Sequence, residues 1–408
     1  MPYYFKLPDY NELTPKQRSA ITKQGAIALS GGPGTGKSVV SVWRHITNYQ
    51  DDIRRSLILT YTKSLRFFLM KSAESKVNSE ENISKRIKIQ NAAAAFGQAY
   101  SWHGCLYDEI IIDEAQDLPE NEIVTLVNDL NPKDIIKKQI NTFEPSLVAG
   151  QTSVIVHGVK YNIVRREIGN IRYISQFSNL ISYGADDKQI LYPEKCTSES
   201  RLREMFSLNS HLPLFQNFRN TYEILIFVRT ILTIDVSQTT LDRMLEDNRT
   251  GPKPVLKLVD TPENQNAAIL EIIKDFNNGV NNIAILYPLI KQVTNFSSFL
   301  SSNLILHTNY TSENHDIVEI ENIHVTTFKS VKGLEFDVVI IPDFGSYRDN
   351  IIKLNVVNEE DYNVAFTRAK RNLFLISESE LPISEEVLKR EKFMTEREKL
   401  IDFLDNYK

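Results

Sequence analysis

The sequence predicts an α/β protein with two domains, each built around a parallel sheet. Its 408 residues exceed what one hydrophobic core usually serves. Short apolar runs alternate with helical patterns along the chain, and most runs are continuous rather than alternating in polarity, as in strands buried on both faces. Hydrophobic residues make up 42% and charged residues 24%, which places the chain among folded proteins and outside the disordered class.

The first domain is predicted to cover residues 1–208. Its expected strands are "AIALS", "SLILTYT", "RIKIQ", "EIII" and "LISYG", separated by helical patterns. Residues 135–172 interrupt this pattern, because "SLVAGQTSVIVHGVKYNIV" is rich in β formers with glycines at turn positions. We therefore expect a small β-rich insertion there.

The second domain is predicted over residues 209–380. After a polar stretch and the turn-forming loop "NRTGPKP", the apolar runs "VLKLVD", "NIAILYP", "IHVTTF", "FDVVIIPDF" and "NLFLIS" resume the strand and helix alternation. Residues 381–408 are predicted to form a charged helix with one apolar stripe. We expect this helix to pack on its own domain rather than to extend as an arm that binds a partner.

Composition narrows the function classes. The net charge of −5 argues against a uniformly basic DNA-coating protein, although a local basic groove stays possible. Cys105 and Cys196 stand far apart, which gives little support to a zinc site or a disulfide framework. No stretch approaches the roughly 18 apolar residues of a membrane span, and the first residues lack the order of a signal peptide. The expectation is a cytoplasmic protein without a membrane partner.

The stretch "GGPGTGKS" fits the phosphate-loop pattern between a strand and a helix. Its glycines let backbone N–H groups converge on phosphates at a helix N-terminus, its lysine reaches the β and γ oxygens, and its serine hydroxyl binds Mg²⁺. A plain flexible glycine loop is the alternative, and the flanking strand and helix argue against it. The predicted ATP-binding residues of this loop are Gly34, Thr35, Gly36, Lys37 and Ser38.

The stretch "EIIIDEAQD" places acids at the end of an apolar strand. A carboxylate at the carboxyl end of a parallel strand near a phosphate loop can hold the Mg²⁺ that Ser38 touches, which suits Asp113. Glu114 would then orient and deprotonate the attacking water. The alternative is an ordinary solvated strand end, which the upstream phosphate loop disfavours.

Two arginines of the second domain, Arg219 in "QNFRN" and Arg368 in "VAFTRAK", can neutralise charge on a transferring phosphoryl group. A phosphate-loop kinase or a plain nucleotidase is a further alternative. It leaves the stretches around these arginines without a function.

In this order, the motifs resemble those of the superfamily 1A DNA helicases of the UvrD/Rep type. The resemblance runs from residue 13 to about 375 and includes "LTPKQRSAI", "GGPGTGKS", "LTYTKSL", "DEAQD", "ADDKQILY", "LFQNFRN", "TFKSVKGLEFDVV" and "VAFTRAK". It implies two RecA-like P-loop NTPase domains with the ATP site in the cleft between them. ATP and Mg²⁺ are the implied cofactors.

The resemblance also implies roles for single residues. Gln17 reads the adenine edge, Phe218 stacks on adenine, and Glu335 contacts the ribose. Gln189, together with Gln116, links the γ-phosphate to the DNA groove, and Arg219 and Arg368 contact that phosphate. The implied nucleic-acid contacts are Thr60, Thr62, Lys63, Thr327 and Lys329, whose hydroxyl and ammonium groups suit phosphates rather than bases.

The implied activity is ATP-driven movement on single-stranded DNA, or on a duplex with a single-stranded tail, in the 3′ to 5′ direction. About 45 residues separate "LTYTKSL" from "DEAQD" and roughly 105 separate "LFQNFRN" from "TFKSVKGLEF". We therefore expect the family's helical insertions to be reduced or absent, which affects processive unwinding more than hydrolysis.

The second hypothesis is a nucleotide-gated regulatory subunit that binds a nuclease and unwinds little by itself. The compact helicase-like subunits of bacterial phage-defence systems such as Gabija offer an analogy, which would place the protein in antiviral defence.

Overall fold

The computed structural model divides the described part of the chain into two compact units. The first unit contains Lys6–Gly31 and Gly36–Leu214, and the second contains Met1–Phe5, Gly32–Thr35 and Phe215–Lys408. Within these spans the structure describes residues 3, 5–51, 56–77, 83–98, 109–121, 123, 153–156, 159–162, 181–190, 193–207, 209–232, 234, 236–313, 317, 319–347, 349–353 and 355–378.

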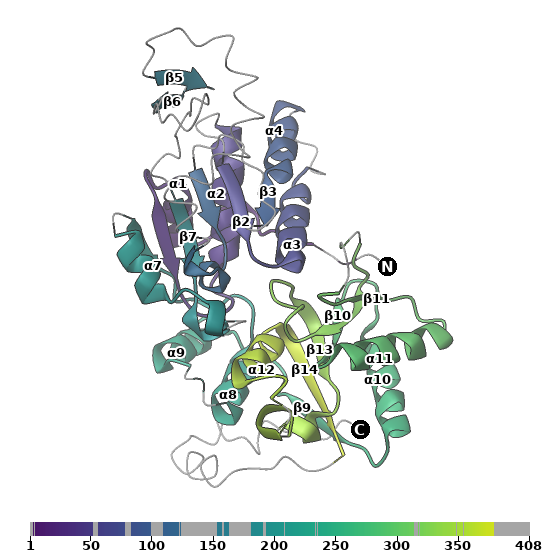
Figure 1. The fold of residues 1–408 in the computed structure, drawn as a ribbon. Coiled ribbons are helices and arrows are strands. Elements are labelled where there is room, and N and C mark those ends of the chain that lie inside the picture. Colours follow the sequence, from purple (N-terminus) through teal and green to yellow (C-terminus); the bar gives the residue numbers. More distant parts are fainter. Residues whose placement is uncertain are drawn as a thin grey trace, which may run out of the picture. The chain divides into compact units, whose positions relative to one another are not determined.

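The first unit has a six-stranded parallel sheet of order β3-β2-β4-β7-β1-β8 (Figure 1). Because all strands run in one direction, their carboxyl ends share one edge of the sheet, where α/β proteins bind ligands. Its strands are β1 (Ile27–Ser30), β2 (Ser56–Thr60), β3 (Phe96–Gln98), β4 (Glu109–Ile112), β7 (Ile181–Ala185) and β8 (Ser210–Pro213).

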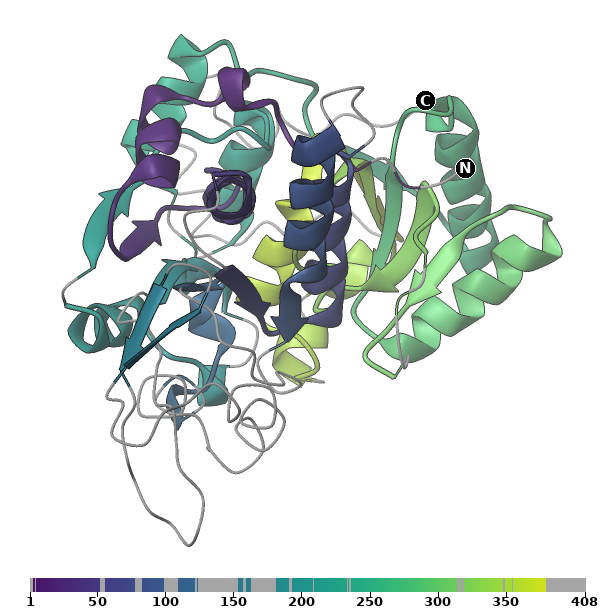
Figure 2. The ribbon, with the colours of Figure 1, turned by 90° about the horizontal axis from the view of Figure 1, so that it is seen from above.

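Both faces of this sheet are buried, which explains the continuous apolar runs of its strands. Ile27 and Leu29 face one core with the helices α1 to α4, whereas Ala28 faces a second core that includes Leu202 of α7. Figure 2 shows α3 and α4 side by side, in agreement with their contacts. The helices of this unit are α1 (Pro15–Thr22), α2 (Lys37–Gln50), α3 (Lys63–Glu74), α4 (Ile83–Ala94) and α7 (Glu199–Met205), with 3-10 turns η1 (Tyr10–Glu12), η3 (Ala115–Asp117), η5 (Asp187–Gln189) and η6 (Pro193–Lys195).

A buried ion pair joins α2 to the sheet. Arg44 Nε lies 2.7 Å from Glu109 Oε1, and both side chains are essentially inaccessible. Glu109 also accepts hydrogen bonds from Asn48 at 3.0 Å and Ser182 at 2.6 Å. The remaining Arg44 N–H groups donate to carbonyls at the end of α1 and in the following loop, those of Ala20, Ile21, Lys23 and Gly25. Arg44 therefore ties the end of α1 and the start of β4 to the helix that follows the phosphate loop.

The second unit has its own six-stranded parallel sheet, of order β11-β12-β10-β13-β14-β9. One face packs on α10 and α11, which supply Ile269, Ile272 and Val293 to the core, while α8 and α12 contact β14. Its strands are β9 (Val255–Leu258), β10 (Ile283–Tyr287), β11 (Thr308–Tyr310), β12 (Ile323–Thr327), β13 (Phe336–Ile341) and β14 (Ala369–Ser377). Its helices are α8 (Tyr222–Ile231), α9 (Gln238–Glu246), α10 (Pro262–Phe276), α11 (Ile290–Ser302) and α12 (Glu359–Phe366), with the short turns η7 (Phe344–Ser346) and η8 (Asp349–Lys353).

The α/β class with two parallel sheets is confirmed, but three details differ from the expectation. The run "RIKIQ" was predicted as a strand and lies inside α4, where Ile89 is buried and Ile87 is half exposed. The strand position next to β2 is taken instead by β3. The unit boundary falls after Leu214 rather than after residue 208, because β8 pairs with β1 in the first sheet.

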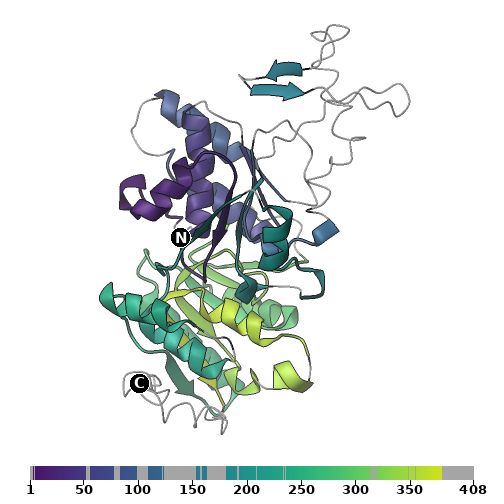
Figure 3. The same ribbon diagram turned by 90° about the vertical axis from the view of Figure 1, so that its left-hand side faces the viewer.

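The expected β-rich insertion contains one described feature, an antiparallel pair of β5 (Ser153–Val156) and β6 (Val159–Asn162), drawn as a separate ribbon in Figure 3. The rest of residues 135–172 and the predicted helix 381–408 lie outside the described residues. Among the helices that are described, none combines the length and apolarity that a membrane crossing requires.

Candidate active site

The phosphate loop leads into α2 through a glycine that no other residue replaces without strain. Gly36 caps α2 with φ 84°, and a Cβ built on it would stand 2.4 Å from Gln17 Nε2. The adjacent Lys37 is buried, donates to the Gly31 carbonyl at 2.7 Å, and lies 3.8 Å from Asp186 Oδ2. The loop therefore holds a lysine ammonium at the carboxyl edge of the first sheet, within reach of an anionic ligand.

Gln17 is fixed by the start of α1. Its backbone N–H donates to the Thr14 hydroxyl at 3.2 Å, and its side-chain oxygen accepts from the Thr14 backbone at 3.0 Å, which is a capping box. This arrangement holds the Gln17 amide beside Gly36 of the phosphate loop.

Asp113 lies directly after β4 and accepts hydrogen bonds from two serines of α2. Ser38 Oγ donates to Oδ2 at 2.7 Å, and Ser41 Oγ donates to Oδ1 at 3.2 Å. Burial, followed by the charge of Glu114, raises the pKa of Asp113 to about 7, against the lowering effect of Ser38, Lys37 and Ser41. The carboxylate is thus held in place at a site where a cation is favoured.

These donors fit a magnesium ion. Mg²⁺ is usually bound by one or two carboxylates with hydroxyl, water and phosphate oxygens completing its shell, and Asp113 with Ser38 offers such a pair. A cation would also offset the cost of ionising a buried carboxylate.

Glu114 and Gln116 form the next part of the site. Glu114 has φ 55°, a left-handed conformation that is uncommon for a residue with a side chain, and precedes η3. Gln116 Nε2 donates to Glu114 Oε2 at 2.5 Å, and Gln116 Oε1 accepts from the Asp186 backbone at 3.1 Å. Gln189 in turn donates to Asp186 Oδ2 at 2.7 Å. Polar contacts therefore connect Glu114, after β4, to Gln189, after β7.

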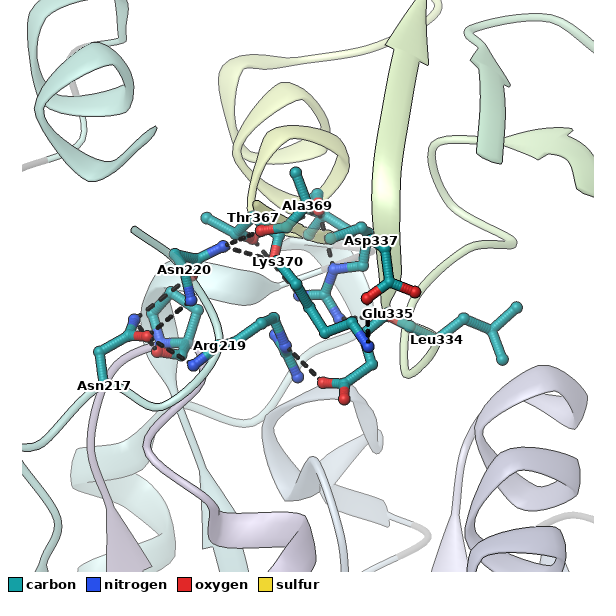
Figure 4. A network of polar contacts seen from close by, with 12 residues as sticks. Asn217, Arg219, Asn220, Leu334, Glu335, Asp337, Thr367, Ala369 and Lys370 are labelled. Atoms are coloured by element: carbon teal, nitrogen blue, oxygen red, sulfur yellow. Dashed lines mark hydrogen bonds and ion pairs between the residues drawn. The ribbon is translucent and has the colours of Figure 1, made fainter. Parts of the chain in front are cut away.

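In the second unit, Asn217 organises the loop that carries Arg219 (Figure 4). Asn217 Oδ1 accepts from the backbones of Arg219 and Asn220, each at 2.9 Å, and Asn217 Nδ2 donates to the Pro33 carbonyl at 2.8 Å. Asn220 Nδ2 donates to the carbonyls of Thr367 at 3.0 Å and Ala369 at 2.7 Å. The loop is thus joined to phosphate-loop residues of the same unit and to the start of β14.

The same loop leaves no room for a side chain at Gly34. Gly34 has φ 71°, and a Cβ there would lie 2.7 Å from Arg219 Cβ and 2.8 Å from Asn217 Oδ1. The Gly34 carbonyl accepts from the Phe218 backbone at 2.8 Å. Phe218 itself is 38% exposed, so part of its side chain is accessible. Thr35, the neighbouring residue of the loop, donates its hydroxyl to the Gly32 carbonyl at 2.9 Å.

Arg219 and Glu335 form an ion pair, with 3.0 Å between Arg219 Nε and Glu335 Oε2 (Figure 4). Burial alone would raise the pKa of Glu335, but the charges of Arg219, Lys370 and Arg368 together hold that pKa below its ordinary value. Glu335 is therefore a carboxylate at neutral pH.

Arg368 is buried at the end of α12. Its Nε donates to the Val364 carbonyl at 2.9 Å, and its Nη1 lies 3.5 Å from the Leu334 carbonyl. The guanidinium is thereby held against the loop before β13, close enough to influence the Glu335 carboxylate.

The predicted nucleic-acid residues lie at strand ends in each unit. Thr60 ends β2, and its buried hydroxyl has no hydrogen-bond partner among the described residues. Thr62 caps α3 by accepting a hydrogen bond from the Leu65 backbone at 3.2 Å, and Lys63 is the first residue of that helix. In the second unit, the Thr327 hydroxyl donates to Ser330 Oγ at 3.0 Å, and Lys329 Nζ lies 3.7 Å from the buried Asp361. These are positions suited to phosphate contacts, and they remain predictions.

Sequence reasoning missed several residues that shape the site. Ser41 donates a hydrogen bond to Asp113, and Asp186 lies close to the Lys37 ammonium. The side chains of Asn217 and Asn220 hold the loop that carries Arg219. The spacing of Ser41, one helical turn after Ser38, and the paired asparagines in "QNFRN" were the available signals.

Comparison with known proteins identifies a curated relative and two solved structures. The relative is the putative ATP-dependent DNA helicase R568 of Acanthamoeba polyphaga mimivirus, 25% identical over 224 residues, which are 50% of this chain and 31% of the viral protein. The chain therefore matches about a third of that relative's length.

The first solved structure is the C-terminal domain of a possible DNA helicase from a Lactobacillus strain, WCFS1, with TM-score 0.30 and 17% identity, covering 42% of this chain and 96% of that one. The second is the PRRSV helicase, with TM-score 0.40 and 12% identity, covering 90% of this chain and 55% of that one.

The family model described as the UvrD-like helicase C-terminal domain matches residues 44–380. This span includes Asp113, Glu114, Arg219 and Arg368, and it extends through both units. The chain belongs to the UvrD-like helicase family.

Proposed function

We propose that this protein hydrolyses ATP and uses the energy to move along single-stranded DNA from 3′ to 5′. The observation that carries the proposal is the hydrogen bond between Ser38 and Asp113, with Lys37 beside them, in a chain of the helicase family. A hydroxyl, a carboxylate and an ammonium group at a strand edge are the groups that phosphoryl transfer requires.

The first unit supplies the side chains for phosphate binding, metal binding and water activation, those of Lys37, Ser38, Asp113 and Glu114. Lys37 and the backbone of the phosphate loop bind the phosphates, and Ser38 and Asp113 hold the metal. When bound, Mg²⁺ neutralises charge that develops on the phosphate oxygens. Glu114 accepts the proton of the attacking water, and its hydrogen bond from Gln116 fixes the orientation of the carboxylate.

The contacts of Gln116 support a role in coupling. Gln116 touches Glu114 through its nitrogen and the Asp186 backbone through its oxygen, and Asp186 also contacts Lys37 and Gln189. A change at the γ-phosphate would therefore alter the hydrogen bonds that connect the residues after β4 with those after β7. We assign Gln189 to this relay, and Thr60, Thr62 and Lys63 to the nucleic acid.

The second unit supplies charge stabilisation and base stacking. Arg219 and Arg368 neutralise the phosphate, Phe218 stacks on adenine, and Glu335 contacts the ribose. Gln17, from the first unit, reads the adenine edge, while Thr327 and Lys329 bind the DNA backbone. The support for the arginine assignments is that both guanidinium groups have defined polar partners, since Arg219 pairs with Glu335 and Arg368 donates to main-chain carbonyls.

The test is an ATPase assay of the purified protein with and without single-stranded DNA, paired with strand displacement on duplexes that carry a 3′ or a 5′ tail. We expect DNA to stimulate turnover and a 3′ tail to be required for displacement. Equal turnover with and without DNA would contradict the proposal. Stimulated turnover without displacement, together with co-purification of a nuclease, would favour the regulatory-subunit alternative.

A further inference from the structure

The N-terminal residue Tyr3 is buried against the loop that carries Glu335. Its backbone N–H donates to the Ile320 carbonyl at 2.7 Å, and only 4% of the residue is exposed. Its ring meets Phe336 edge-on, with 5.4 Å between centroids and an angle of 82°, and packs on Phe5 at 4.7 Å. Tyr3 is therefore a fixed part of the second unit.

The Tyr3 hydroxyl binds both polar backbone groups of Glu335. It donates to the Glu335 carbonyl and accepts from the Glu335 N–H at 3.3 Å. Burial and then the negative charge of Glu335 raise the pKa of Tyr3 well above its ordinary value, so the hydroxyl keeps its proton. One hydroxyl thus sets the position of the Glu335 main chain.

Through Glu335, this contact extends to Arg219. The Glu335 carboxylate accepts from Arg219 Nε at 3.0 Å, and the Arg219 backbone is held by Asn217, which also binds Pro33 of the phosphate loop. Two of these residues, Arg219 and Glu335, are the ones we assign to the γ-phosphate and the ribose. A shift of the Glu335 backbone would move both contacts.

We propose that Tyr3 is a positioning residue for nucleotide recognition, which acts by fixing Glu335 and thereby Arg219. The inference rests on the proposed function, because it uses the assignment of Glu335 to the ribose. Its specific consequence is that an aromatic residue before the phosphate loop governs discrimination between ribose and deoxyribose nucleotides.

The test uses Tyr3→Phe, which removes one oxygen and keeps the ring packing. Titration calorimetry measures the Kd of a non-hydrolysable ATP analogue and of its 2′-deoxy and 3′-deoxy forms, so that turnover is not required. Loss of one hydrogen bond predicts about five- to tenfold weaker binding of the ribose form. We expect the affinity ratio of ribose to deoxyribose forms to fall in Y3F and equally in Glu335→Gln, and the double variant to lose no more than either single one.

The matched control is Tyr10→Phe, a partly buried tyrosine packed on Trp43 of the first unit. We expect it to leave the Kd and the affinity ratio unchanged. A purely structural role for Tyr3 predicts a lower melting temperature with an unchanged ratio, and that result would overturn the inference. If the wild-type protein binds the analogue but does not hydrolyse ATP, the proposed function fails while the ratios still decide the role of Tyr3. Absence of any nucleotide binding would overturn both.

Discussion

Ser38 and Asp113, which are 75 positions apart in the sequence, are joined by a hydrogen bond of 2.7 Å. The contact connects the helix after the phosphate loop to the end of β4, so the two candidate metal ligands meet at one sheet edge. Because Ser41 holds the other oxygen of Asp113, the carboxylate is oriented from both sides.

Glu114→Gln should reduce ATP turnover by roughly 10²- to 10⁴-fold, because the amide cannot accept the proton of water. ATP binding should stay within a few-fold of wild type, since the shape of the side chain is kept. Lys37→Ala should instead abolish binding. Turnover by a coupled assay and Kd by calorimetry separate the two effects, with Lys274→Ala, an exposed lysine of α10, as control. Wild-type turnover in E114Q would rule out Glu114 as the base.

Arg44→Ala should destabilise the protein by about 3–5 kcal/mol, because Glu109 would be left as a buried charge without its partner. Arg201→Ala is the matched comparison. Arg201 pairs with Glu120 and Glu204, but all three side chains are at least 44% exposed, so solvent screens these pairs and the loss of stability should be small. Urea unfolding monitored by circular dichroism measures the free energy of unfolding of both variants. Similar losses for the two variants would contradict this account of the buried pair.

His45 should make stability depend on pH. It is buried between Ser56 and the Ala92 carbonyl, and burial lowers its pKa to about 4, below the ordinary 6.5. Between these values the unfolded chain binds a proton that the folded protein does not, so stability should fall as pH decreases from 6.5 to 4, by about 3 kcal/mol in total.

The measurement for His45 is the urea midpoint at pH 7.0, 6.0 and 5.0. His45→Gln should be less stable at neutral pH but lose less stability on acidification than wild type. Part of the slope should remain, since buried His324, whose pKa burial lowers to about 3, titrates in the same direction. An unchanged slope in H45Q would mean that other groups govern the acid sensitivity.

Asp361 should weaken nucleic-acid binding at neutral pH. Burial raises its pKa to about 6 despite Lys329, which lies 3.7 Å away, and Glu360 is the other charged neighbour. When Asp361 is ionised, it competes with a phosphate for the Lys329 ammonium. Binding in the wild type should therefore tighten by several-fold as pH falls below 6, and Asp361→Asn should bind tightly at pH 7.5 as well.

Fluorescence anisotropy with single-stranded DNA at pH 5.5 and 7.5 measures this effect. The salt dependence should steepen in Asp361→Asn, by up to about one unit of slope for one additional phosphate contact. Lys329→Ala provides the control, because it should bind more weakly and lose the pH dependence. Equal pH dependence in wild type and D361N would refute the competition.

The fold class could be predicted because continuous apolar runs such as "SLILT" and "EIII" identify strands buried on both faces. The run "RIKIQ" misled, since its alternating isoleucines have a strand-like period of two, while the alanines that follow favour the helix. The strand β3 was not predicted because it has only three residues with a central glycine, and β8 was not predicted because its sequence SHLP contains no continuous apolar run and is only partly buried.

The residues of the candidate site could be predicted where they belong to a recognised sequence motif. Lys37, Ser38 and Asp113 come together in the structure. Contacts between distant positions that belong to no motif were not predictable. In the sequence, Glu109 is an ordinary acidic residue beside an apolar strand, and nothing indicates its contacts with Arg44 and Ser182. In the same way, the sequence around Tyr3 does not indicate its contact with Glu335.

The assignment of Tyr3 and of Gly32–Thr35 to the second unit has a practical consequence for dissecting this protein. The chain passes between the units at residues 5–6, 31–32, 35–36 and 214–215, so no single cut yields two complete halves. A fragment starting at Phe215 would lack the hydroxyl that holds Glu335 and the carbonyls that hold Asn217 and Phe218. A cut between residues 214 and 215 should therefore leave the first unit complete and the second unit incomplete. Point substitutions are a better way to study the two units.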